Sequence, residues 1–121
     1  MAEQDFSTMT REHLEAKLAQ EKPDNEDAEK GYALVYVLDP QTFAHAHIPG
    51  SINIPRGSED EFEQRFSKSK EIIIYSFSPE CDASPRVREE LMSRGFVNVQ
   101  NYGSGMSYWK AGKKAVARGN T

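Results

Sequence analysis

Two short, uninterrupted apolar runs constrain the fold of this chain more than any other feature of its sequence. Residues 33–38 (ALVYVL) and Glu71–Tyr75 (EIIIY) lack the alternation of polar and apolar residues that a half-exposed strand shows. Runs of this kind are typical of strands that are buried on both faces, as in a parallel sheet. A third, shorter run at 96–99 follows Gly95 and predicts another strand.

The segments between these runs carry helical patterns. Thr10 is a good N-cap for a helix that we expect over Arg11–Gln20, in which two leucines fall one turn apart on the same face. Two further helices are expected over 60–66 and 85–94. Strands that alternate with helices indicate βαβ units, so the pattern predicts an α/β fold with a parallel sheet.

Length and composition limit the classes of function. We expect one domain over residues 1–121, in which 21–30 (EKPDNEDAEK) is an inserted acidic loop that is solvated and mobile. A net charge of −4 with interspersed signs argues against a nucleic-acid partner. No apolar run is long enough to cross a membrane, and the N-terminus lacks a signal-peptide pattern. One cysteine forms no internal disulfide, which favours a reducing, cytoplasmic setting.

The segment after Tyr75 is the first place to look for a site, because ligands of open α/β sheets bind beyond the carboxyl ends of the strands. It reads SFSPECDASPR and ends in Ser84 and Pro85, an N-cap residue followed by proline at the expected first helical position. A strand, a short loop and a helix N-terminus form an arrangement that cradles an anion or a thiolate with main-chain N–H groups. Cys81, the only cysteine, lies in this loop.

Two further motifs resemble those of rhodanese-like domains. Residues 43–55 (FAHAHIPGSINIP) are similar to the family's motif of an aromatic residue, His-Ile-Pro-Gly and a short strand. Residues 93–116 (SRGFVNVQNYGSGMSYWKAGKKAV) resemble its C-terminal signature, which carries Gly-x-Gly-Met and a tryptophan. The resemblance extends over residues 9–116, and it implies a central parallel sheet of about five strands with helices on both faces.

The resemblance also implies a chemistry. Rhodanese-like sulfurtransferases use a loop cysteine that takes a sulfane sulfur from a donor such as thiosulfate, becomes a persulfide, and passes the sulfur to a thiol or to cyanide. The partners implied are a small anionic sulfur donor and a thiol acceptor, and no metal or organic cofactor is implied. Main-chain N–H groups of the loop and the helix dipole would stabilise the thiolate and the persulfide.

The sequence departs from the family pattern at the nucleophile. Ser76 stands directly after the strand, where relatives carry the cysteine, and a serine hydroxyl carries no persulfide. Whether this serine is natural or engineered is open. The residues at 36–38 replace a frequent Asp-Val-Arg, and Ala46 replaces a frequent glycine. These changes favour an alternative function, a catalytically inactive module of the same fold that binds a protein partner or a small anion.

Cys81 is the remaining candidate nucleophile. Some relatives have a second cysteine five residues after the first and a serine three residues later, a spacing that Ser76, Cys81 and Ser84 fit. Cys81 also precedes Arg86 by five residues, the family's common spacing. A phosphatase of related architecture needs an arginine six residues after the cysteine, where this chain has Val87, so this third alternative is disfavoured.

The predicted site therefore has three groups of residues. The catalytic candidates are Cys81 and Ser76. The residues expected to bind the substrate or an anion are Phe77, Ser78, Pro79, Glu80, Asp82, Ala83, Ser84 and Arg86. The supporting residues are His47, which is expected to orient the following turn, Gly105, expected in a tight turn that faces the loop, and Trp109, expected in packing or at the mouth of the site. A metal is not expected, because His45 and His47 have no third ligand in sequence.

Charges around Cys81 oppose one another. The helix N-terminus and Arg86 would lower the thiol pKa, whereas Glu80 and Asp82 would raise it, so the sign of the net effect is open from sequence.

Overall fold

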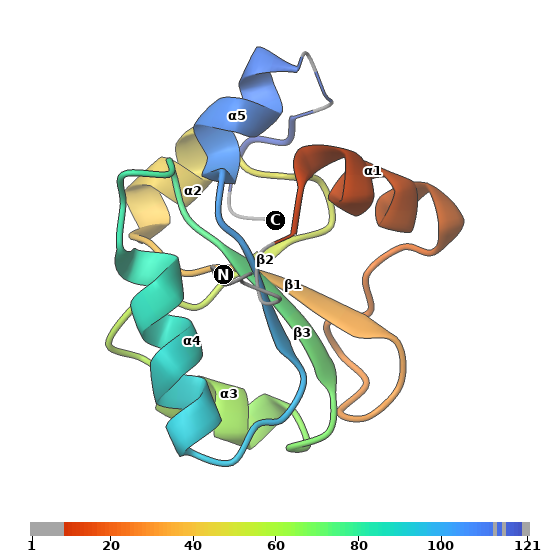
Figure 1. The fold of residues 1–121 in the computed structure, drawn as a ribbon, viewed down its shortest axis with the longest axis vertical. Helices are drawn as coiled ribbons and strands as arrows, with labels where there is room; N and C mark the ends of the chain where they lie inside the picture. Colours follow the sequence, from red (N-terminus) through yellow and green to blue (C-terminus); the bar gives the residue numbers. More distant parts are fainter. Residues whose placement is uncertain (1–8, 113, 115, 120–121) are drawn as a thin grey trace, which may run out of the picture.

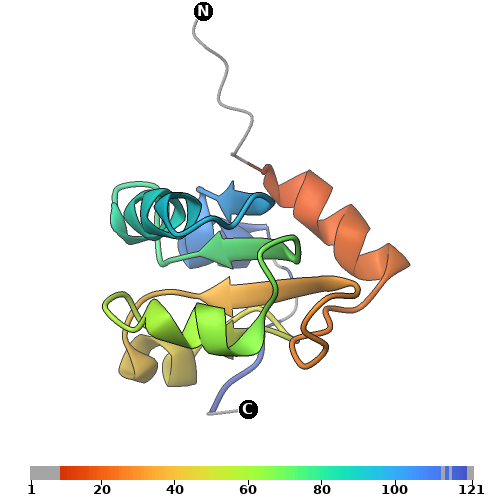
Figure 2. The same cartoon turned by 90° about the horizontal axis from the view of Figure 1, so that it is seen from below.

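A parallel sheet of four strands forms the centre of the computed structural model, which describes residues 9–112, 114 and 116–119 (Figure 1). In spatial order the strands are β2 (Ile52–Asn53), β1 (Tyr32–Tyr36), β3 (Glu71–Tyr75) and β4 (Val99–Tyr102). The arrows of β1 and β3 point the same way in Figure 2. The predicted α/β fold is confirmed. Residues 1–8, on which the expectation about a signal peptide rests, lie outside the described residues.

Helices cover both faces of the sheet. They are α1 (Arg11–Gln20), α2 (Pro40–His45), α3 (Asp60–Arg65), α4 (Ala83–Ser93) and α5 (Gly105–Ala111). Leu14, Phe43 and Trp109 place α1, α2 and α5 against one buried cluster. Phe62 and Leu91 place α3 and α4 against a second cluster on the opposite face. None of the helices within the described residues is long and apolar enough to cross a membrane.

The burial of β1 on both faces explains why its sequence shows no alternation of polar and apolar residues. Tyr32, Leu34 and Tyr36 point into the first cluster, and Ala33 and Val35 point into the second. All five side chains are buried. Because successive side chains of a strand alternate between faces, a strand covered by helices on both sides needs apolar residues at every position.

The helix α1 has the predicted bounds, and its predicted cap is confirmed, because Thr10 Oγ1 accepts the N–H of His13 at 3.0 Å.

The start of the strand predicted at 96–99 is wrong by three residues, since β4 begins at Val99. The reason is a turn that ends α4. Gly95 has a φ of 102° in this turn, and the N–H of Phe96 donates to Leu91 O at 3.1 Å. Phe96 is therefore a buried turn residue rather than a strand residue.

The segment 21–30 is a mostly exposed loop, as expected, but it contains more hydrogen bonds than a bland connection would, and its expected mobility stays a prediction. The carboxylates of Asp24 and Asp27 each accept two main-chain N–H groups from the residues that follow them, at 2.8–3.1 Å. These hydrogen bonds lower the pKa of both carboxyls. The buried ammonium of Lys70 donates to the carbonyl oxygens of Asp24, Asp27 and Lys30 at 2.5–2.8 Å. A residue distant in sequence thus organises the loop.

A closed set of hydrogen bonds ties the centre of the sheet to the turn after His47. The hydroxyl of Tyr75 accepts the N–H of Ile48 at 2.9 Å and lies 2.8 Å from Ser51 Oγ. Because Ser51 Oγ donates to Ile48 O at 2.7 Å, the Tyr75 hydroxyl donates to Ser51. Burial raises the pKa of Tyr75, so the phenol stays protonated near neutral pH.

We expect Tyr75→Phe to lower the free energy of unfolding by about 1–3 kcal/mol, because it leaves the buried N–H of Ile48 without an acceptor. Tyr102→Phe is the matched control. The Tyr102 hydroxyl is buried and has no hydrogen-bond partner within the described residues, so its removal should be neutral or stabilising. Urea unfolding of the two variants tests this, and equal losses would contradict it.

Candidate active-site loop

The loop 76–82 joins the carboxyl end of β3 to α4. The N–H of Cys81 donates to Ser78 O at 3.1 Å, which closes a turn with Pro79 and Glu80 exposed at its tip. The Phe77 side chain is 44% exposed. This segment is the strand, loop and helix start that the sequence predicts, at the edge of the sheet where ligands of α/β proteins bind.

Ser76 lies beneath the loop rather than on its surface. The residue is 1% exposed, and its hydroxyl has no hydrogen-bond partner within the described residues. Its carbonyl oxygen accepts the N–H of Met106 at 2.9 Å, and Phe77 O accepts the N–H of Ser107 at 2.7 Å. The first turn of α5 therefore holds the start of the loop in place, a support that sequence analysis did not assign to Met106 or Ser107.

Gly105 makes this close approach feasible. It has a φ of 75°, and a Cβ atom added there would lie 2.8 Å from main-chain atoms of each of residues 76, 77 and 78. Contacts that short do not occur for real Cβ atoms, so only glycine fits between α5 and the loop. The structure thus gives the physical reason for the predicted tight turn that faces the loop.

Cys81 is partly buried and is not in a disulfide. It packs against the apolar cluster between the sheet and α3 and α4. On the neighbouring strand β1, burial raises the pKa of the Tyr36 phenol, and the hydrogen bond with Thr42 opposes this effect. Tyr36 is the last residue of β1 and the first of the positions 36–38 at which the sequence departs from the Asp-Val-Arg pattern.

The helix after the loop begins earlier than predicted. α4 starts at Ala83 with Asp82 at its N-cap, so Ser84 and Pro85 lie inside the first turn. The prediction that Ser84 caps the helix is wrong, because Ser84 is buried at 1% exposure and the helical hydrogen bonds already start with Arg86 N–H to Asp82 O at 3.2 Å. Proline is tolerated there since the first-turn N–H groups have no intrahelical acceptor. Cys81 is thereby brought within two residues of the helix.

Asp82 pairs with two positively charged side chains next to the loop. Arg86 Nε donates to Asp82 Oδ2 at 2.7 Å, and Arg56 reaches Asp82 Oδ1 at 3.4 Å. The hydrogen bond with Arg86 lowers the pKa of the Asp82 carboxyl and raises that of the guanidinium. Both side chains are about 60% exposed (62% and 61%), so solvent weakens the pair. The sequence did not indicate that Arg56 lies at this loop, because Arg56 belongs to the segment after β2 and is distant from Asp82 in the chain.

The remaining supporting residues lie away from the loop. His47 is buried, its Nδ1 atom is 2.8 Å from Phe43 O, and its ring stacks on that of Phe43 at 3.8 Å. Trp109 is 3% exposed and meets the Tyr102 ring edge-on at 6.2 Å. Both residues pack the α1, α2 and α5 face. In the part of the chain that the structure describes, no three His, Cys, Asp or Glu side chains are grouped as metal ligands.

Comparison with known proteins defines the family. The model of the rhodanese-like domain family matches residues 11–112, and the chain belongs to that family. It is 29% identical over 83 residues to the thiosulfate sulfurtransferase GlpE of Pseudomonas savastanoi pv. phaseolicola, with 69% of this chain and 76% of the relative covered. It is 28% identical over 93 residues to the protein of that name from Pseudomonas fluorescens, with 76% and 84% covered.

A solved structure has a similar fold. The BH2092 protein from Bacillus halodurans superposes with a TM-score of 0.77 at 26% sequence identity, over 92% of this chain and 76% of that one. A helix-covered parallel sheet of this kind is thus common to the two proteins. The resemblance implies about five strands; the described residues contain four, and an isolated antiparallel bridge between His47 and Ala117 adds a further extended contact.

Proposed function

We propose that this protein accepts a sulfane sulfur on Cys81 and transfers it to a thiol or to cyanide. The observation that carries the proposal is the position of Cys81, the only thiol of the chain, in the loop after β3 and directly before the first turn of α4. Membership of the rhodanese-like family and the similarity to thiosulfate sulfurtransferases support it.

The chemistry with thiosulfate as donor needs only the thiolate. Cys81 Sγ attacks the outer sulfur of thiosulfate, a new S–S bond forms, and the S–S bond of the donor breaks so that sulfite leaves with the electron pair. Cyanide or an acceptor thiolate then attacks the terminal sulfur of the persulfide and regenerates the Cys81 thiolate. No external oxidant or reductant enters the first transfer or the transfer to cyanide.

The start of α4 offers main-chain N–H groups to an anionic donor. The first N–H groups of α4 have no intrahelical acceptors, and the described hydrogen bonds do not use the N–H groups of Asp82, Ala83 or Ser84. These groups and the positive end of the helix dipole would attract an anionic donor to the start of α4, next to Cys81. The paired Asp82 and Arg86 leave the loop rim close to neutral, so attraction of a doubly charged donor would depend on the helix end.

Substitution of the two candidate nucleophiles separates their roles. We expect Cys81→Ser to abolish thiocyanate formation from thiosulfate and cyanide, because a hydroxyl neither ionises near neutral pH nor carries a persulfide. Ser76→Ala should retain the activity, since the buried Ser76 hydroxyl lies beneath the loop. A colorimetric assay of thiocyanate measures the activity of both variants. Full activity in Cys81→Ser would contradict the proposal.

The alternative is an inactive module that binds a small anion or a protein partner. The observation that favours it is the burial of Ser76, the residue that the family resemblance implies at the nucleophile position. Under this alternative the native chain and Cys81→Ser are equally inactive with thiosulfate, and Ser76→Cys gains activity by restoring a thiol at the end of β3. Activity of the native chain that depends on Cys81 would exclude it.

A further inference from the structure

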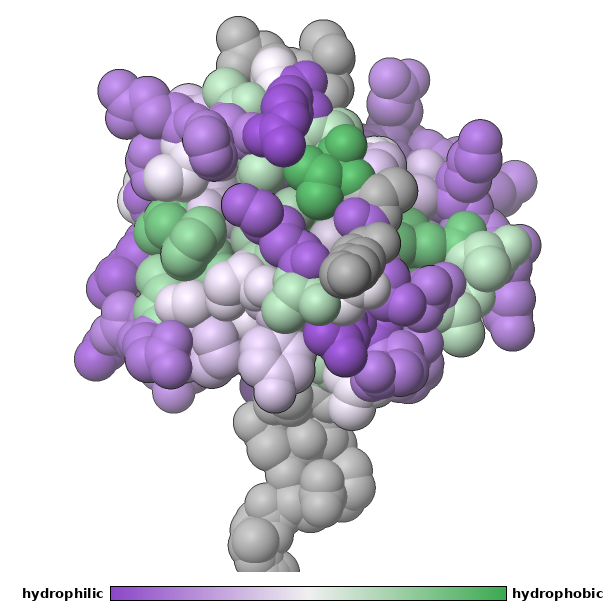
Figure 3. Space-filling model, turned by 90° about the horizontal axis from the view of Figure 1, so that it is seen from above, coloured by the Kyte–Doolittle hydropathy of each residue, from purple (hydrophilic) through white to green (hydrophobic). Residues whose placement is uncertain are grey.

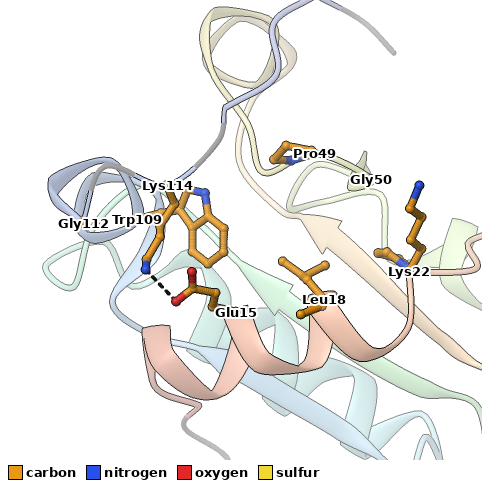
Figure 4. A pocket seen from close by; sticks show the side chains of 10 residues that line it. Glu15, Leu18, Lys22, Pro49, Gly50, Trp109, Gly112 and Lys114 are labelled. Carbon is orange, nitrogen blue, oxygen red and sulfur yellow. Dashed lines mark hydrogen bonds and ion pairs between the residues drawn. The ribbon is translucent and has the colours of Figure 1, made fainter.

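A groove of about 720 Å³ lies on the face of the molecule opposite to the α4 side, between α1, α5 and the turn after His47 (Figure 4). None of the residues that line it comes from the loop 76–82. Cys81 packs against the cluster of α3 and α4, whereas Trp109 of the groove belongs to the cluster of α1, α2 and α5. The groove is therefore separate from the candidate active site.

The walls of the groove are apolar. Leu18 and Ala19 come from α1, Pro23 and Pro49 from the two loops, and Trp109 from α5. Figure 4 shows the Leu18 side chain and the Trp109 indole on the two helices that border the space. In the space-filling view from above, hydrophobic residues reach the surface in separate areas between charged ones (Figure 3).

The groove is also preformed. The edge-on contact with Tyr102 fixes the Trp109 ring. Gly50 has a φ of 89° and approaches Pro23 so closely that an added Cβ would lie 3.2 Å from the proline ring. Asn25 Nδ2 donates to Gly50 O at 2.7 Å and holds the two loops together. A mainly apolar groove of this size, with walls fixed by such contacts, is typical of a small-molecule site.

The charges of the groove are unequal at its two ends. Lys114 Nζ and Glu15 Oε1 form an ion pair of 2.6 Å at one end, so these two charges compensate each other. Lys22 lies at the other end in Figure 4, is exposed, and has no ion pair or hydrogen bond with any described residue. One ammonium group that has no ion pair within the described residues therefore borders a mainly apolar space, with the acidic residues of the loop 21–30 on its other side.

We propose that this groove binds a small amphipathic monoanion, a molecule with an aliphatic body and one carboxylate. The aliphatic body would lie between Leu18 and Trp109, and the carboxylate would pair with the Lys22 ammonium. The combination of mainly apolar walls and one placed charge matches this ligand class. The proposal does not involve Cys81, so it holds or fails independently of sulfur transfer.

Trp109 gives the experiment a local reporter, because it is the only tryptophan in the chain. Octanoate and its neutral counterpart 1-octanol, both below their aggregation limits, are titrated into the full chain while tryptophan fluorescence is recorded. We expect a saturable change with both probes and tighter binding of octanoate. An unchanged spectrum with octanoate, or a change only with phosphatidylglycerol vesicles, would overturn the proposal, the latter in favour of a membrane surface.

Three variants test the assignment of the groove. Lys22→Gln should weaken octanoate binding by about two- to fivefold, the effect of one exposed ion pair, and leave 1-octanol unchanged. Lys110→Gln, which removes an exposed charge of α5 that does not line the groove, should change neither affinity. Ala19→Phe, at an exposed helix position, should fill the groove and abolish the binding of octanoate and of 1-octanol. Thermal unfolding of this variant should stay cooperative. Equal effects of Lys22→Gln and Lys110→Gln, or undiminished binding to Ala19→Phe, would overturn the proposal.

Discussion

Gly105→Ala is expected to lower the free energy of unfolding by about 3 kcal/mol or more. A non-glycine residue at a left-handed backbone position costs about 1–2 kcal/mol, and Gly105 has a φ of 75°. The added methyl would also meet three main-chain atoms of residues 76–78 at 2.8 Å, where no flexible side chain can give way. Overpacking of this kind costs about 1–3 kcal/mol more. Because the stability of a domain is about 5–15 kcal/mol, the loss is large.

Gly57→Ala provides the matched control. Gly57 has a φ of 100°, but an added Cβ would have no atom within 4 Å. It therefore measures the backbone cost alone, about 1–2 kcal/mol. Urea unfolding of both variants gives the difference that belongs to the contact between α5 and the loop. Equal losses for the two glycines would show that α5 does not press against the loop start as described.

Lys70→Met is expected to have the second large effect, also about 3 kcal/mol or more. The buried Lys70 ammonium donates to three carbonyl oxygens of the loop 21–30, and its Nζ atom lies 5.7 Å from the centre of the Phe66 ring. Methionine keeps the length and the apolar stem but leaves the three carbonyls without their donor. Each unsatisfied buried acceptor costs about 1–3 kcal/mol, and partial opening of the loop to water limits the sum.

The control for this variant is Lys30→Met, which removes an exposed ammonium from the same loop. We expect a change within about 0.5 kcal/mol for it. Hydrogen exchange then locates the damage. In Lys70→Met the N–H groups of residues 26, 27, 29 and 30 should lose protection, because Lys70 no longer holds the main chain of Asp24 and Asp27, whose carboxylates accept these groups. Unchanged protection of these groups in Lys70→Met would mean that the loop orders itself without Lys70.

The sequence predicted those parts of the fold whose cause is local or periodic. The run Glu71–Tyr75 is β3 with the predicted bounds, because a strand between two helical layers must be apolar throughout. α1 likewise begins after Thr10, whose side chain caps it. The helices α2 and α5 were not predicted. Each is at most seven residues long, and α5 starts at a glycine whose role depends on the loop 76–82.

Features that depend on contacts between residues distant in the chain could not be predicted from the sequence. The order of the loop 21–30 comes from Lys70, which in sequence is only one lysine of a charged turn. The start of α4 was placed late because Ser84 and Pro85 have strong local preferences, which burial of Ser84 against the sheet overrides. The pairing of Asp82 with Arg56 joins segments 26 residues apart.

The structure adds a difference in burial between the two candidate residues of the predicted site, which itself stays a prediction. Ser76 is buried and tied by its carbonyl to α5, whereas Cys81 lies in the partly exposed part of the loop next to the start of α4. A donor arriving from solvent would meet Cys81 first. This is the physical reason why the proposed sulfur transfer rests on Cys81 rather than on Ser76.

Intact-mass spectrometry after treatment with thiosulfate tests the central proposal most directly. The reduced native protein and Cys81→Ala are incubated with thiosulfate in parallel, and an alkylating agent confirms that the native thiol is reactive. We expect the native chain to gain the mass of one sulfur atom, the variant to gain nothing, and the added mass to disappear with cyanide. If the native thiol alkylates normally but gains no sulfur, Cys81 is not a carrier of sulfane sulfur from thiosulfate.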